Sequence, residues 1–132
     1  MNREILADIF CHQLKGIMLH VDMYCVAVLH GYRRLKMLHE KAVKEDTESF
    51  IRTRYKSIEY LGTILDIPSP GRIDVPYDAT EHELNVMWLK WEMDAAEMYG
   101  KAIEEDPDCR IWKGLHQAAA NEIRCISLLE KK

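Results

Sequence analysis

Apolar residues recur along the chain at intervals of three and four, the spacing that places side chains on one face of an α-helix. This pattern fills two nearly equal halves of the 132 residues, and no stretch of useful length alternates as a strand would. Between the halves, the segment 66–78 holds three of the four prolines, which remove backbone donors and fix φ. We therefore predict an all-α protein whose two helical halves are joined by a crossover at about residues 66–79.

The first half is predicted to form a hairpin of two helices. One long helix should run from about Asn2 to about Lys44, with a bend near Gly31, and a second should follow to about Leu65. The turn between them is weakly marked. We place it at residues 44–47, which include two residues that can cap a helix.

The second half has clearer boundaries and predicts a second hairpin. The segment TEHE at residues 80–83 reads as a capping box, so a helix should begin at Thr80 and continue to about Glu105. The Asp-Pro-Asp sequence at 106–108 should then break the chain, and a last helix should run to Lys131. Residues 1–132 thus form one domain, an antiparallel four-helix bundle of two hairpins.

Polar side chains interrupt the apolar stripes of three of the predicted helices. The first stripe contains Gln13 and His20, the third contains Glu92 and the fourth contains Glu122. A buried carboxylate is costly unless it is paired, hydrogen-bonded or bound to metal, and two that face each other repel. A cation between the two glutamates would compensate this cost. A helix rotation that turns one glutamate outward would avoid it, and a hydrogen-bond partner such as an arginine, Tyr99 or water would also compensate it. The stripes are Leu6, Ile9, Gln13, Gly16, His20, Met23 and Ala27; Asn85, Trp88, Glu92, Ala95, Tyr99 and Ala102; and Ile111, Leu115, Ala118, Glu122, Cys125 and Leu129.

Two segments resemble the metal-binding helices of bacterioferritins and rubrerythrins. The segment EMDAAEMYGKAI at 92–103 is similar to their third helix, which begins its motif with a metal-bridging glutamate. The segment NEIRCISLLE at 121–130 is similar to their fourth helix, which supplies a Glu-x-x-His pair. The stretches at 13–17 and 30–35 fall at the spacing of their first-half counterparts. The resemblance implies a ferritin-like bundle with a long crossover and an iron-handling centre.

The resemblance leaves only part of the family's ligand set unchanged. Glu92 and Glu122 match family glutamates, whereas Gln13 stands where the first helix has a glutamate and Cys125 where the fourth has its histidine. An ordinary symmetric di-iron centre is therefore not expected. His20, two helical turns after Gln13, is an inward-facing residue that could compensate.

The second-helix motif of the family has two alternative matches here. Its Glu-x-x-His falls near Asp46 and Ser49, with Glu45 and Glu48 as the alternatives if the register differs by one residue. The position where some relatives hold haem with a methionine corresponds to Thr47, so no haem is expected. The resulting candidate metal ligands are Gln13, His20, Asp46, Glu92, Glu122 and Cys125. Such a mixed donor set suits iron, zinc or manganese better than calcium or magnesium.

Competing interpretations of the histidines and cysteines stay open. A single inward histidine is more often hydrogen-bonded in a core than bound to metal, and a buried cysteine is usually inert packing. The four cysteines form no Cys-x-x-Cys pair and are expected to be free thiols. We interpret the remaining histidines as surface or interface residues. They are His12, His30, His39, His82 and His116.

Charge and hydropathy exclude several function classes. The net charge of −4, without a basic face or tail, gives no reason to expect nucleic-acid binding. The most apolar stretch, residues 17–29, is too short to span a bilayer and contains His20 and Asp22. Residues 1–4 do not resemble a signal peptide, so a cytoplasmic location is the default expectation.

The same apolar stretch predicts a subunit interface. A helix that faces only a core needs part of its surface apolar, and residues 17–29 are apolar nearly all round. The surplus predicts a homodimer or higher homo-oligomer through the first helix, as in the dimers of the resembled family. The candidate contacts are Tyr24, Cys25, Val28 and Tyr32.

Two functional hypotheses follow. The first is a ferritin-like protein that binds metal at a divergent carboxylate centre and acts in iron or redox handling. The second is a non-catalytic helical interaction protein that kept the fold and lost the metal site. The substituted ligand positions are the reason to keep the second.

Overall fold

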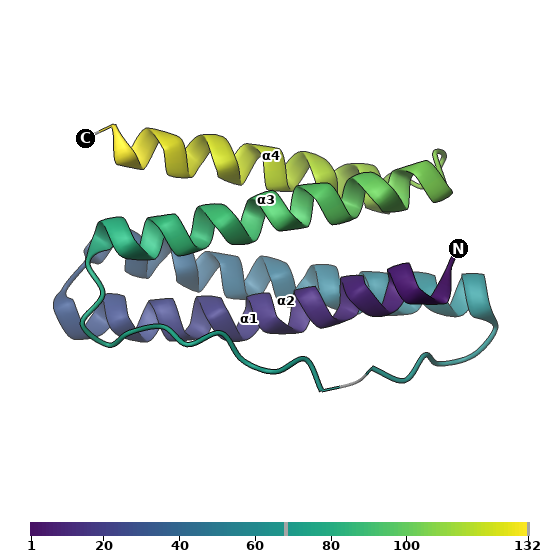
Figure 1. The fold of residues 1–132 in the computed structure, drawn as a ribbon, viewed down its shortest axis with the longest axis horizontal. Helices are drawn as coiled ribbons and strands as arrows, with labels where there is room; N and C mark the ends of the chain where they lie inside the picture. The colour runs from purple at the N-terminus through teal and green to yellow at the C-terminus, as the bar shows by residue number, and fades with distance from the viewer. Residues whose placement is uncertain (68, 132) are drawn as a thin grey trace.

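The computed structural model describes residues 1–67 and 69–131, and this part of the chain folds into four helices without a strand. The helices are α1 (Arg3–His30), α2 (Arg33–Leu61), α3 (Glu81–Glu105) and α4 (Arg110–Glu130). α1 packs on α2 and α3 packs on α4, which gives two hairpins (Figure 1). The prediction of an all-α four-helix bundle built from two hairpins is confirmed.

The crossover sets the direction of the second hairpin. From the end of α2 the chain returns along the length of the bundle, so α3 starts near the end where α2 started and the two run in the same direction (Figure 1). Side chains from this segment contribute to the core, since Leu65 and Ala79 are buried. Hydrogen bonds from Arg54 to the Leu65 carbonyl and from Tyr32 to the Ala79 carbonyl fix both ends. Pro68, one of the prolines expected to break the helical pattern, lies outside the described residues.

The predicted turn at residues 44–47 is wrong, because these residues lie inside α2. α1 ends instead at Gly31, whose positive φ of 72° lets its own N–H and that of Tyr32 bond the last carbonyls of the helix. Thr47, expected as a cap, donates its hydroxyl to the Val43 carbonyl within α2. The helix that was predicted to bend near Gly31 therefore ends there, and α2 starts at Arg33.

The boundaries of the second hairpin are confirmed. Thr80 and Glu83 form the reciprocal capping box, with the Thr80 hydroxyl accepting from the Glu83 N–H at 3.1 Å and the Glu83 carboxylate accepting from the Thr80 N–H. α3 ends at Glu105, directly before the Asp-Pro-Asp sequence. Local capping chemistry was sufficient to place these ends.

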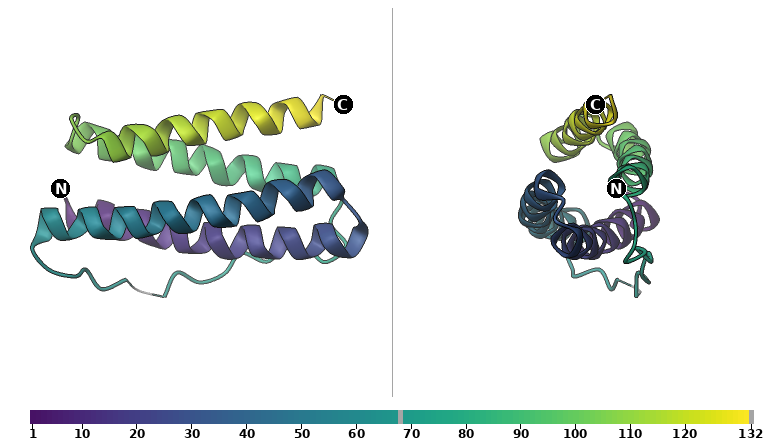
Figure 2. Two further views of the ribbon diagram at one scale, coloured as in Figure 1. Left: turned by 180° about the vertical axis from the view of Figure 1, so that it is seen from behind. Right: turned by 90° about the vertical axis from the view of Figure 1, so that its left-hand side faces the viewer.

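The core consists of two apolar clusters separated along the bundle. All seven residues of the predicted stripe on α1 are buried. On α4 the stripe is wrong by one position, since the buried residues are Trp112, Ala119 and Ile126. The physical reason is that α4 packs on α3 and not closely on α2, so its buried face is rotated toward α3. The end-on view shows α1 beside both α2 and α3, with α4 beside α3 (Figure 2).

The two hairpins meet chiefly through α1 and α3, at a point where a glycine faces a tryptophan. A Cβ added to Gly16 would lie 2.8 Å from Nε1 of Trp91, so only glycine admits the indole at this position. The His12 ring stacks on the same indole with centroids 3.6 Å apart and planes 7° from parallel. This contact holds the hairpins at a short separation.

Gly16→Ala is predicted to destabilise the protein by about 1–3 kcal/mol, because overpacking forces the indole or the helices apart. Urea denaturation followed by circular dichroism measures this. Gly100→Ala is the matched control: its Cβ would meet nothing within 4 Å, and alanine favours a helix interior by about 1 kcal/mol, so this variant should gain stability. Equal effects of the two substitutions would contradict the packing argument.

Candidate metal centre

A cavity of about 250 Å³ lies in the middle of the bundle, and residues from all four helices line it. Five of the six predicted ligands are among the lining residues, and Cys125 is not. The five are Gln13 and His20 from α1, Asp46 from α2, Glu92 from α3 and Glu122 from α4. The bundle therefore brings together side chains that are up to 109 positions apart in the sequence, the separation between Gln13 and Glu122.

Burial raises the pKa values of the three acidic candidates, and the charges of neighbouring carboxylates add to the rise. Burial raises the pKa of Glu92 to about 8, and the charges of Asp46 and Glu122 add to this effect. Burial and the charges of Glu122 and Glu45 raise the pKa of Asp46 to about 7. The pKa of Glu122 is raised by burial and by Glu45, with Lys41 opposing. Like charges thus face one interior space with little compensation.

Little positive charge is available inside the cavity. Among its lining residues in the described chain, only Arg52 is cationic at neutral pH, and Arg52 is exposed. Burial lowers the pKa of His20 to about 3, so its imidazole is neutral. The lining therefore has a net negative charge whenever its carboxylates ionise.

Both alternatives for the second-helix motif face the cavity. Asp46 and Ser49 line it, and so do Glu45 and Glu48. Glu45 also acts electrostatically on the other carboxylates, since its charge raises the pKa of both Asp46 and Glu122. The two registers therefore stay equally compatible with the placement of α2.

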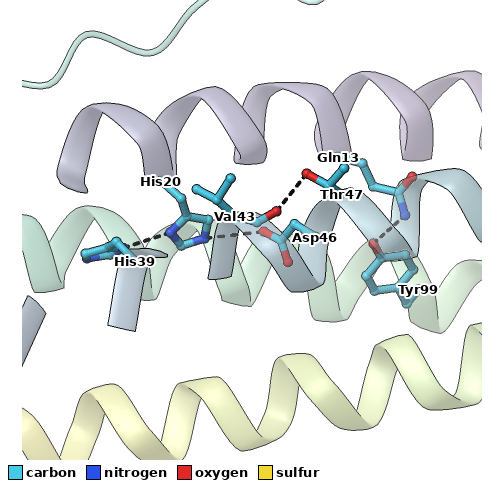
Figure 3. Close-up of polar contacts among 7 residues, drawn as sticks. All are labelled: Gln13, His20, His39, Val43, Asp46, Thr47 and Tyr99. Atoms are coloured by element: carbon cyan, nitrogen blue, oxygen red, sulfur yellow. Dashed lines mark hydrogen bonds and ion pairs between the residues drawn. The ribbon is translucent and has the colours of Figure 1, made fainter. Parts of the chain in front are cut away.

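A pair of histidines connects the cavity to the core, and Figure 3 shows it between α1 and α2. His20 is 1% exposed; its Nδ1 lies 2.8 Å from Nδ1 of His39, and its Nε2 lies 3.5 Å from Oδ2 of Asp46. Both rings contact Trp88, with centroid distances of 6.0 Å from His20 and 4.8 Å from His39. Burial lowers the pKa of His39 to about 4, so this ring too is neutral.

The interpretation of His39 as a surface or interface residue is wrong, and His12 is half-buried. His39 is fully buried at 0% exposure, and His12 stacks on Trp91 with its pKa lowered by burial to about 4. A sequence signal for His39 did exist: it falls four residues after Leu35 and seven before Asp46, at the spacing of one helix face. The misplaced turn hid this pattern. The other three histidines, at 30, 82 and 116, are exposed as predicted.

Gln13 links three helices through hydrogen bonds. Its Nε2 donates to the Tyr99 hydroxyl at 3.2 Å, and its Oε1 accepts from the Thr53 hydroxyl at 2.7 Å. Figure 3 shows the Gln13 amide and the Tyr99 hydroxyl facing each other, and both residues line the cavity. Both the oxygen and the nitrogen of the amide are hydrogen-bonded within the protein, as is typical of a buried polar residue with a structural role. Thr53, a hydroxyl residue within α2, was not among the predicted site residues, because its sequence context carries no signal of this role.

Cys125 lies one turn beyond Glu122 on α4 and is half-buried. Its thiol pKa is raised by burial and by the charge of Glu122, while Arg34 and Lys41 oppose the rise. A thiol with a raised pKa is a poor nucleophile and a poor metal ligand. The structure therefore brings five of the candidates to one cavity and leaves the sixth beside it.

The donor chemistry of the cavity fits a divalent cation. Carboxylates and a neutral imidazole are good ligands for iron, zinc and manganese, and a cation would compensate the mutual repulsion of the carboxylates. Within residues 1–67 and 69–131, no three His, Cys, Asp or Glu side chains are already grouped as a formed metal site. A bound ion would have to draw these side chains together.

Comparison of the sequence with models of known protein families and with curated proteins gives no match. None of the described helices combines the length and apolarity that a membrane crossing requires.

Without metal, the free energy of unfolding is predicted to fall as pH rises from about 6.5 to about 8. Glu92 binds a proton in the folded state until pH approaches its raised pKa of about 8, whereas a glutamate of the unfolded chain, with its ordinary pKa of 4.5, has already lost it. Asp46 contributes less, because its side chain is 38% exposed and water screens its charge. Below pH 6.5 the buried histidines act oppositely, since only the unfolded state protonates them.

Urea titrations in EDTA at several pH values measure this dependence. Glu92→Gln should flatten the fall above pH 6.5, and Glu97→Gln, an exposed position on the same helix, should not. A metal-free wild type that becomes more stable from pH 6.5 to 8 would show that Glu92 is not held in a desolvated environment.

Proposed function

We propose that this chain is a ferritin-like metal-binding protein, and that its central cavity binds a divalent ion in iron handling or redox chemistry. One observation carries the proposal: Asp46, Glu92 and Glu122, from three helices, line the same cavity, where burial and the charges of neighbouring carboxylates raise their pKa values. A cavity of this kind is destabilising when its carboxylates are ionised and alone, and a cation removes that cost.

The connectivity of the bundle supports the ferritin-like part of the proposal. Two antiparallel hairpins joined by a crossover that runs the length of the bundle is the arrangement of ferritin-like folds, whose metal sites use inward-facing glutamates on separate helices. The segments at 92–103 and 121–130, which resemble the family's motifs, contribute Glu92 and Glu122 to the lining. Many unrelated bundles share the fold class, so the site residues carry the functional argument.

The proposed ligands have distinct roles. Asp46, Glu92 and Glu122 would hold the ion and neutralise its charge, and His20 would add a nitrogen donor that favours iron, zinc or manganese. A bound ion of this kind supplies Lewis acidity, and iron or manganese also supplies one-electron redox chemistry with oxygen. Gln13 and Tyr99 would shape the cavity through their mutual hydrogen bond.

The proposal also includes a cytoplasmic location and a homodimer through the outer face of α1. Val28 is 50% exposed and Cys25 is exposed, so both present surface for a second subunit. Tyr24 and Tyr32 are half-buried, and the Tyr32 hydroxyl is used within the chain. Met18 and Val21 extend the exposed apolar surface of the same helix.

Metal binding is predicted for protein that is purified without chelator. Metal analysis and titration with Mn²⁺, Zn²⁺ or anaerobic Fe²⁺ should find about one or two ions per chain. Free metal at about 100 times its dissociation constant should raise the free energy of unfolding by about 2.7 kcal/mol. The double variant Glu92→Gln/Glu122→Gln should lose both effects, because two of the three carboxylates are gone.

Glu97→Gln is the matched control for this experiment, since Glu97 lies on α3 outside the cavity lining and pairs with Lys101 on the surface. It should bind metal as the wild type does. A wild type that holds no metal and does not respond to chelation would refute the metal hypothesis. If Glu122→Leu then proved neutral or stabilising, the non-catalytic interaction protein would be the better description.

A further inference from the structure

The contact between His20 and His39 determines which atom of His20 faces the cavity. Nδ1 of His20 lies 2.8 Å from Nδ1 of His39, which is a hydrogen-bond distance. The opposite ring atom, Nε2, consequently points toward Asp46 and the cavity that His20 lines (Figure 3). A rotated imidazole would lose this hydrogen bond and leave a nitrogen of the buried His39 without its partner.

His39 makes no polar contact that would give it another role. Its side chain is fully buried and does not line the cavity, and its Nε2 has no hydrogen-bond partner within the described residues. A buried polar ring with one unpaired nitrogen costs free energy that an apolar residue would avoid. Packing on Trp88 alone would be served equally well by phenylalanine.

The hydrogen bond also couples the tautomers of the two rings. Each neutral imidazole has one N–H, so one Nδ1 must donate and the other must accept. When Nε2 of His20 offers its lone pair to an ion, its proton resides on Nδ1, and Nδ1 of His39 is the acceptor in reach. Histidines that bind metal usually donate their second N–H to such a partner, which orients the ring and raises its basicity.

We propose that His39 is the positioning residue for His20, which it orients as the nitrogen ligand of the cation through the Nδ1–Nδ1 hydrogen bond. This inference rests on the proposed metal site and adds a residue that does not itself touch the ion. His39 acts from α2 on a ligand of α1, so the orientation of the nitrogen ligand depends on the packing of the first hairpin.

Zn²⁺ and Mn²⁺ titrations of the full chain test this role. His39→Phe keeps a ring against Trp88 but removes the acceptor, and should weaken binding about 10–100-fold. His39→Asn places an amide oxygen near the position of Nδ1 and should restore much of the affinity. The double variant His20→Ala/His39→Phe should bind no more weakly than His20→Ala alone, because His39 acts only through His20.

A spectroscopic measurement on the wild type makes the test independent of how well each variant folds. In zinc-loaded protein with ¹⁵N-labelled histidine, His20 should carry its proton on Nδ1 and none on Nε2. Unchanged affinity in His39→Phe, a further loss in the double variant, or a proton on Nε2 of loaded His20 would each overturn the inference.

The same series of variants distinguishes failure of the inference on His39 from failure of the proposed metal-binding function. A wild type that binds metal, with Glu92→Gln/Glu122→Gln losing it and His39→Phe unaffected, removes His39 from the site and leaves the site itself in place. A wild type that binds neither Zn²⁺ nor Mn²⁺ would refute both the metal site and the role of His39.

Discussion

The burial of carboxylates around a small cavity is the constraint on which the rest of the structure depends. Two apolar clusters stabilise the bundle on either side, and Asp46, Glu92 and Glu122 line the cavity between them. Burial is the main cause of their raised pKa values, and the charges of neighbouring carboxylates add to it, since a proton removes both the desolvation cost and the repulsion. A divalent ion would relieve it more completely.

The packing of the hairpins keeps this cavity open. α1 and α3 come close at Gly16 and Trp91, whereas α2 and α4 are not closely packed on each other. The charges that α2 presents to α4 are of both signs, since Glu45 raises the pKa of Glu122 and Lys41 lowers it. A second cavity of about 370 Å³ between these two helices is lined by Arg52 and Arg110.

Polar networks tie the helices of the cavity wall together. The hydrogen bonds from Thr53 to Gln13 and from Gln13 to Tyr99 connect α2, α1 and α3, while the pair of His20 and His39 connects α1 to α2. Such networks are satisfied only in one arrangement of the helices, so they specify the register of the core as well as stabilise it. Gln13 is fixed in this network through both ends of its amide.

The sequence by itself determined the helical class, the two hairpins, the capping box at Thr80 and the buried stripes of α1 and α3, because these depend on spacing and local capping chemistry. It also selected Glu92 and Glu122, since a carboxylate within an apolar stripe is conspicuous. Only the tertiary structure decided the end of α1 at Gly31, the rotation of α4 and the burial of His39. These depend on a left-handed glycine and on which neighbour each helix packs against, and no local pattern encodes the choice of neighbour.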